Sequence, residues 1–151
     1  MTAPAVFQIP TAVTLIEGAQ TLGLQIRNIS ELIQHLEQGL KPAVARRLAE
    51  HVRVPLTTLY KDLDVAARTI TKAKKDRTPL SRDKSETLYR AARIFERTLR
   101  LFHGDEAKAA HWMITPKFGL GGATPLQYAR TEPGGESVLE LLEELLDGGV
   151  A

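Results

Sequence analysis

The sequence contains no cysteine among its 151 residues and few aromatic side chains. The lack of cysteine excludes disulfide bonds, thiolate metal sites and a cysteine nucleophile, and it fits a reducing cytoplasm. With aromatics at 5%, the core must be built from Leu, Ile, Val and Ala. No apolar run approaches the roughly 20 residues of a membrane-spanning helix. Residues 1–10 contain no Lys or Arg, so we expect no secretory signal there.

The charges are distributed unevenly along a chain of ordinary globular composition, whose net charge is +2. Residues 66–84 contain seven basic and two acidic side chains, whereas residues 132–151 contain six acidic and no basic ones. This asymmetry predicts two surfaces with different partners. The alternative is that both segments are simply the solvated faces of helices.

Hydrophobic periodicity predicts an all-α fold, a helical bundle without β-strands. The length suits one compact domain or two very small ones. The expected helices cover about residues 11–28, 30–38, 42–52, 55–63, 66–76, 82–103, 106–113, 125–129 and 133–146.

Polar residues and glycines mark the expected ends of these helices. Ser30, Asp105 and Thr124 are expected N-caps, and Pro125 suits the first helical position after Thr124. Glycine is expected to end three helices, at Gly39, Gly104 and Gly148–Gly149. The side chains expected to face the core include Leu32, Ile33, Leu36, Leu88, Ala91, Ala92, Phe95, Leu99, Phe102, Ala107, Ala110, either Trp112 or Ile114, Val138, Leu141, Leu142, Leu145 and Leu146.

The three short helices over residues 42–76 have the proportions of a helix-turn-helix motif. The third helix presents side chains that can contact DNA bases and phosphates, namely Arg68, Thr69, Thr71, Lys72, Lys74 and Lys75. A solvated basic helix within a bundle is the alternative. The turn before this helix lacks the usual glycine and contains Asp62 and Asp64 instead. We expect these carboxylates to cap the third helix, although they also repel phosphate.

No catalytic or metal-binding constellation is recognisable. The glycines of residues 118–124 fit neither phosphate-binding fingerprint and are typical of a turn between helices. The four histidines lack metal-ligand spacing, and the serines lie near helix starts, where they cap. We therefore expect no enzyme activity, no metal and no cofactor.

The C-terminal third carries an ordered set of unusual residues. They are Ala107, His111-Trp112-Met113, Pro116, Leu120-Gly121-Gly122, Thr124-Pro125-Leu126, Arg130-Thr131-Glu132, Gly134, Val138, Leu141-Leu142 and Gly148. This run resembles the toxin-binding domain of Xre/ParS-type (MbcA/ParS/Xre) antitoxins over about residues 81–151. Arg68-Thr69-Ile70 is similar to the family's recognition-helix motif, although Ala73 stands where the family often has a second arginine.

The resemblance implies an antitoxin of a type II RES-Xre toxin–antitoxin system. Its partner would be a RES-domain toxin that degrades NAD or ADP-ribosylates, and the antitoxin tail, residues 148–151, would occupy the toxin's NAD pocket. The resemblance also implies a cytoplasmic homodimer within a larger complex, which represses its own operon by binding operator DNA and involves no membrane. The implied domains are 1–39 (N-terminal helices, with a possible role in dimerisation), 40–80 (helix-turn-helix) and 81–151 (toxin binding).

The toxin-binding residues implied by the resemblance lie in the C-terminal third. They are Trp112, Leu120, Gly121, Tyr128, Thr131, Leu142, Leu145, Leu146, Gly148, Gly149, Val150 and Ala151. Two other functions remain open: a stand-alone transcriptional regulator that uses the C-terminal domain to dimerise, and a protein-interaction module whose helix-turn-helix no longer binds DNA.

Overall fold

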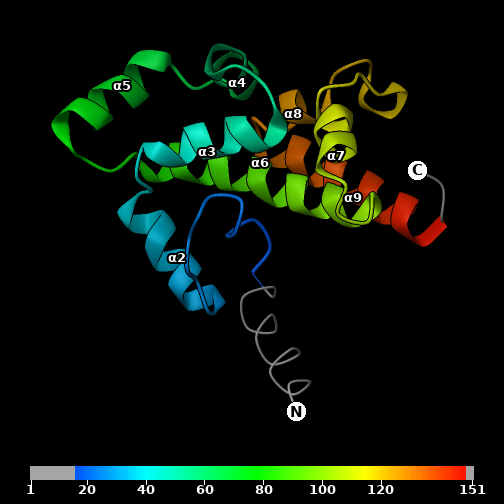
Figure 1. The fold of residues 1–151 in the computed structure, drawn as a ribbon, viewed down its shortest axis with the longest axis horizontal. Coiled ribbons are helices and arrows are strands. Elements are labelled where there is room, and N and C mark those ends of the chain that lie inside the picture. The colour runs from blue at the N-terminus through cyan, green and yellow to red at the C-terminus, as the bar shows by residue number, and fades with distance from the viewer. Residues whose placement is uncertain (1–15, 149–151) are drawn as a thin grey trace.

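The computed structural model describes residues 16–148, and every regular element in this part of the chain is a helix. The longest, α6 (Arg82–Leu101), runs through the middle of the molecule (Figure 1). The other elements are α2 (Ile29–Gln38), α3 (Ala43–Val52), α4 (Leu56–Leu63), α5 (Ala67–Asp76), α7 (Glu106–Met113), the 3₁₀ turn η1 (Phe118–Leu120), α8 (Pro125–Tyr128) and α9 (Glu132–Gly148). The prediction of an all-α fold is confirmed.

Helix α6 organises the core because its apolar side chains recur with the helical period. Phe95 is completely buried, as are Ala91 and Ala92 beside it. Helices α2, α3, α7 and α9 all pack against α6. Ser81 caps the start of α6, where its Oγ accepts a hydrogen bond from the Lys84 N–H at 3.2 Å.

The two halves of the chain share one core. Helix α3 packs on α7, and α4 packs on α8. Leu59 of α4 and Leu126 of α8 are both fully buried in this cluster. Hydrogen bonds also hold the two ends of the segment 40–80 together and attach them to α6. The Leu40 N–H donates to Ser85 Oγ at 2.8 Å, and the Leu40 carbonyl accepts from the Leu80 N–H at 2.8 Å.

The prediction of a helix over residues 11–28 is wrong for residues 16–28, the part that the structure describes. Residues 16–23 form turns, and α2 begins only at Ile29. Gly18 and Gly23 adopt left-handed φ angles of 95° and 74°, which interrupt a helix. The Glu96 carboxylate of α6 accepts hydrogen bonds from the N–H groups of Gly18 (2.7 Å) and Thr21 (2.9 Å), and so replaces intrahelical partners. Residues 11–15 lie outside the described part of the chain.

Three details at helix ends and faces also differ from prediction. Asn28, not Ser30, caps α2, because its Oδ1 accepts from the Glu31 N–H at 2.9 Å. Ile33 is 49% exposed, since the inward face of α2 is narrow and is centred on Leu32. Ala107 is exposed on the outer side of α7.

Two of the three predicted N-caps are confirmed. Asp105 accepts from the Lys108 N–H at 3.1 Å at the start of α7, and Thr124 forms a reciprocal capping box with Gln127 at the start of α8. The predicted end of the last helix is wrong in its position, because α9 continues through Gly148. Gly149 lies outside the described residues. No helix within residues 16–148 has the length and hydrophobicity required to cross a lipid bilayer.

Candidate interaction surfaces

The turn between α4 and α5 is tight although it contains no glycine. Asp64 adopts the left-handed conformation with φ 56° that glycine usually takes, and the Val65 N–H donates to the Tyr60 carbonyl at 2.9 Å. Asp64 therefore ends α4, and neither it nor Asp62 caps α5, whose N-cap position is Ala66 without a side-chain hydrogen bond. The expectation that these carboxylates cap the third helix is wrong.

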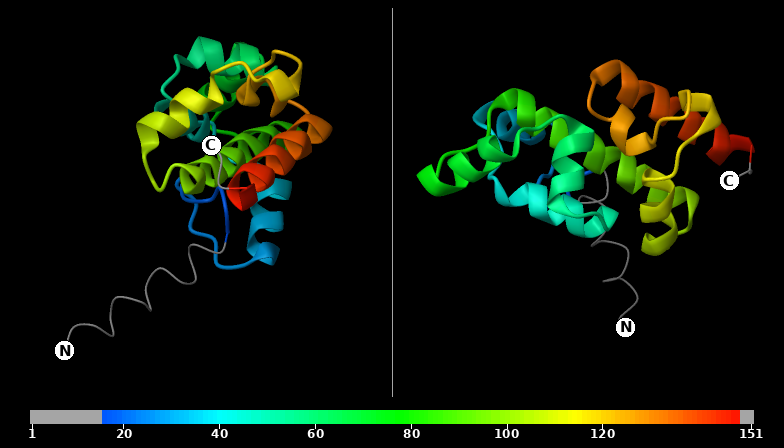
Figure 2. Two further views of the ribbon diagram at one scale, coloured as in Figure 1. Left: turned by 90° about the vertical axis from the view of Figure 1, so that its right-hand side faces the viewer. Right: turned by 90° about the horizontal axis from the view of Figure 1, so that it is seen from above.

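Helix α5 presents nearly all of its surface to solvent. Only Ile70 and Ala73 are buried, as their spacing predicts. Of the side chains expected to contact DNA, Thr69 is half-buried. The others are exposed, namely Arg68, Thr71, Lys72, Lys74 and Lys75. Helix α5 lies at one end of the molecule, and the C-terminal end of α9 lies at the other (Figures 1 and 2).

The polar side chains of α5 are not equally available to a partner. Lys72 Nζ lies 2.7 Å from Asp76 Oδ2, and Thr71 Oγ1 donates to the Ala67 carbonyl at 3.0 Å. Arg68 and Lys75, by contrast, form no ion pair with any of residues 16–148. Arg68 occupies the first turn of α5, the part of a recognition helix that usually contacts base edges.

Two further lysines extend this positive surface beyond α5. Lys61 and Lys84 line an open groove with Tyr60 and Thr69, beside the turn between α4 and α5. Lys84 Nζ also reaches the Asp64 carbonyl at 3.4 Å. The α5 helix and this groove together form the basic surface of the protein.

Helix α9 forms an acidic surface. Its acidic side chains are all exposed, namely Glu132, Glu136, Glu140, Glu143, Glu144 and Asp147. Thr131 caps α9, because its Oγ1 accepts from the Gly134 N–H at 3.1 Å. A Cβ at Gly134 would lie only 2.2 Å from the Tyr128 carbonyl oxygen, so glycine is required for α8 and α9 to approach closely.

The structure separates the predicted toxin-binding residues into interior and surface positions. Trp112, Leu120 and Leu142 are buried, so their side chains support the surface from beneath. The half-buried or exposed ones are Gly121, Tyr128, Thr131, Leu145, Leu146 and Gly148. Gly149, Val150 and Ala151 lie outside the described residues.

The loop at residues 117–123 exposes an aromatic side chain that the sequence analysis did not select. Phe118 is completely exposed, and its neighbour Lys117 places Nζ 4.6 Å from the centre of the Trp112 ring. Burial lowers the pKa of Lys117. The only sequence signal was a phenylalanine between Lys117 and Gly119, outside any hydrophobic period.

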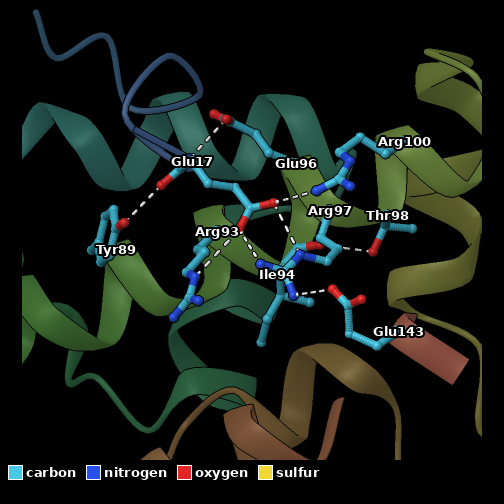
Figure 3. Close-up of polar contacts among 10 residues, drawn as sticks. Glu17, Tyr89, Arg93, Ile94, Glu96, Arg97, Thr98, Arg100 and Glu143 are labelled. Carbon is cyan, nitrogen blue, oxygen red and sulfur yellow. Dashed lines mark hydrogen bonds and ion pairs between the residues drawn. The ribbon is translucent and has the colours of Figure 1, made fainter. Parts of the chain in front are cut away.

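A second feature that the sequence analysis missed is an ion-pair network around Glu17 (Figure 3). Its carboxylate contacts Arg97 at 2.7 Å, Arg93 at 3.3 Å and Arg100 at 3.5 Å. Burial alone would raise the pKa of Glu17, but hydrogen bonds and charge attraction from Arg97 and then Arg93 outweigh it and lower the pKa. The Tyr89 hydroxyl donates to the Glu17 carbonyl at 2.7 Å, and burial raises the pKa of Tyr89.

Comparison with known proteins assigns a family to both halves of the chain. Residues 31–93 match the antitoxin Xre-like helix-turn-helix domain, and residues 98–148 match the antitoxin Xre/MbcA/ParS C-terminal toxin-binding domain. The chain is 26% identical over 127 residues to antitoxin Xre of Yersinia enterocolitica, covering 84% of this chain and 86% of that protein.

Two further relatives carry the same name. Antitoxin Xre of Pseudomonas putida is 32% identical over 93 residues, which cover 62% of this chain and 58% of that protein. Antitoxin Xre of Photorhabdus laumondii is 38% identical over 69 residues, 46% of this chain and 47% of that protein. The exposed basic α5 lies in the first matched domain and the acidic α9 in the second. The chain belongs to the Xre/MbcA/ParS antitoxin family, with an Xre-like helix-turn-helix followed by a C-terminal toxin-binding domain.

Proposed function

We propose that this antitoxin belongs to a type II pair and neutralises a RES-domain toxin that degrades NAD or ADP-ribosylates. It binds the toxin through its C-terminal domain, and its tail, residues 148–151, covers the toxin's NAD pocket. Through α5 it binds operator DNA and represses its own operon. It acts in the cytoplasm, where that DNA lies, as a homodimer and without catalysis or a cofactor of its own.

The separation of charge carries this proposal. Helix α5, which carries the exposed basic residues, lies at one end of the molecule, and the C-terminal part of α9, which carries exposed acidic residues, lies at the other (Figure 2). A basic surface attracts the phosphate backbone of DNA. A toxin pocket that binds the pyrophosphate of NAD is positively charged, and an acidic helix complements it. The two partners therefore do not compete for one surface.

The end of α9 suits the proposed role of the tail. Leu145 and Leu146 are half-buried and hold the last turns of α9 on the body of the protein. Gly148 is exposed, and a Cβ built there would meet nothing within 4 Å. The tail therefore follows a helix end that is held on the protein, and the space around Gly148 leaves room for a narrow cleft of a partner to enclose it.

Co-purification tests the toxin partnership. The tagged chain would be expressed with the RES-domain protein encoded beside it, and the mass of the eluted species would be measured by light scattering. We expect a complex of fixed stoichiometry, and NAD depletion when the toxin is expressed alone. A lone antitoxin dimer without a partner would contradict the proposal and favour the second candidate, a stand-alone regulator, which the exposed α5 also supports.

Deleting residues 148–151 tests the role of the tail. We expect the truncated chain to remain bound to the toxin but to leave cellular NAD unprotected. Ile33→Ala is the control, because it alters an exposed side chain on α2, outside the C-terminal domain, and the antitoxin should protect fully. Full protection by the truncated chain would show that the tail does not cover the pocket.

Replacing Arg68 and Lys72 with alanine tests the DNA-binding role of α5. We expect operator affinity in a gel shift to fall strongly, while the toxin complex is unchanged. A control that removes the same amount of charge elsewhere is Arg27→Ala with Arg130→Ala, two exposed arginines outside α5. Equal affinity of the α5 variant and the control would contradict this role.

A further inference from the structure

Phe118 is an exposed aromatic side chain with no partner in the described chain. It is fully exposed, whereas the next most exposed large apolar side chain within residues 16–148, Ile29, is 59% exposed. Leaving a phenyl ring in water is unfavourable, and large exposed apolar groups commonly mark interaction sites. Phe118 therefore requires an explanation that the fold itself does not provide.

The loop that carries Phe118 is held in one conformation. The Lys117 N–H donates to the Ala123 carbonyl at 3.0 Å, and the Gly122 N–H donates back to the Lys117 carbonyl at 3.0 Å. Leu120, in the middle of the loop, is only 3% exposed and fixes it to the core. Phe118 is thus presented on a preorganised backbone, which reduces the entropy lost on binding.

Lys117, the residue before Phe118, borders an apolar hollow. The hollow has a volume of about 450 Å³, and Phe102, Ala107, Trp112 and Lys117 contribute to its walls. Lys108, His111 and Thr115 complete the wall, and Lys108 and Lys117 give it a positively charged rim. An apolar centre with a charged rim is the usual anatomy of a protein–protein interface.

We propose that Phe118 and this hollow are the anchor of the toxin interface and determine which toxin the antitoxin recognises. Phe118 enters an apolar pocket of the toxin, an apolar toxin side chain fills the hollow, and acidic toxin groups pair with Lys108 and Lys117. This inference rests on the proposed function.

Two observations favour the toxin over a second copy of the chain. Phe118 lies within residues 98–148, the segment that matches the toxin-binding domain. The loop also lies at the same end of the molecule as the C-terminal part of α9, opposite α5 (Figures 1 and 2). A partner held by Phe118 is therefore placed to contact the end of α9 as well.

The test compares three full-length variants in binding the purified RES-domain protein encoded beside this chain. Phe118→Ala removes the ring, Phe118→Tyr keeps it, and Ile33→Ala is a matched control that truncates another exposed apolar side chain, on α2. We expect Phe118→Ala to raise the Kd for the toxin about 30-fold or more, which is the scale of an interface hot spot. Phe118→Tyr should remain within a few-fold of the wild type, and Ile33→Ala should bind as the wild type does.

Melting temperature and mass in solution distinguish the other outcomes. All three variants should have the melting temperature of the wild type, because Phe118 and Ile33 are exposed. Wild-type binding by Phe118→Ala would overturn the inference but leave the proposed function intact. A wild-type chain that does not bind the toxin would overturn both. A change of the free antitoxin from dimer to monomer in Phe118→Ala would assign the surface to a second copy and also overturn the inference.

Discussion

Arg97 donates two parallel hydrogen bonds to the Glu17 carboxylate, from Nε at 3.0 Å and from Nη2 at 2.7 Å. The remaining nitrogen, Nη1, contacts Glu143 of α9 at 2.7 Å. One guanidinium group on α6 therefore joins the segment before α2 to the toxin-binding half of the protein (Figure 3). Because only 14% of the Arg97 side chain is exposed, solvent screens this contact less than an ordinary surface ion pair.

We predict that Glu17→Gln lowers the free energy of unfolding by about 1–3 kcal/mol, because the Arg97 guanidinium, whose side chain is only 14% exposed, loses a charged acceptor. Urea denaturation would measure the change. Asp76→Asn is the comparison, since it breaks an exposed ion pair with Lys72 and should cost less than about 0.5 kcal/mol. Equal effects in the two variants would show that the Glu17 network adds no more than a surface pair.

The Glu17 network should also make stability depend on pH. Its pKa is lowered below the usual value near 4.5, so the unfolded chain binds this proton more readily than the folded one. The stabilisation is therefore complete above that value and is lost as the pH falls below it. Melting curves should show a large difference between the wild type and Glu17→Gln at pH 7 that shrinks below pH ~4.5. A difference that is constant from pH 7 to pH 3 would contradict this account.

Gly134→Ala should destabilise the protein by about 1–3 kcal/mol, although alanine usually favours a helix. The reason is that the added Cβ would lie 2.2 Å from the Tyr128 carbonyl oxygen and force α8 and α9 apart. Thermal unfolding would measure the effect. Gly119→Ala has open space around the new Cβ and should stay within about 0.5 kcal/mol of the wild type. A neutral Gly134→Ala would mean that the close approach of these helices is not required.

Asp76→Asn should tighten DNA binding several-fold at low salt. The substitution releases Lys72, whose Nζ lies 2.7 Å from the Asp76 carboxylate, and removes a negative charge from the basic surface. Fluorescence anisotropy with operator DNA at two salt concentrations would test this, and the gain should shrink at the higher one. Asp147→Asn makes the same charge change on α9 and should leave DNA affinity unaltered. A similar gain in both variants would indicate a general charge effect.

The sequence predicts the helices of residues 42–113 well, because their signals are local. Ser81 and Asp105 lie at helix starts and cap them, and Ile70 and Ala73 share one face of a short helix. The segment of residues 16–23 could not be predicted in this way. Its turns depend on Glu96, a residue 75 or more positions away, which accepts hydrogen bonds from its backbone.

The same distinction holds for the surfaces. The basic face of α5 is visible in the sequence, since Arg68, Lys72 and Lys75 recur with the helical period. Phe118 carries no such signal, because a single aromatic residue in a glycine-containing loop is equally compatible with burial. Its exposure follows from Leu120, which takes the inward position in the loop instead.

The sparse packing of α5 bears on how this protein can diversify. Of its ten residues, only Ile70 and Ala73 are buried, so most of the other positions can change with little effect on the stability of the fold. If α5 binds operator DNA as proposed, substitutions there change which operator is bound and leave the distant C-terminal end of α9 untouched. Duplicated copies in one genome can therefore acquire separate transcriptional control while each keeps immunity to its own toxin.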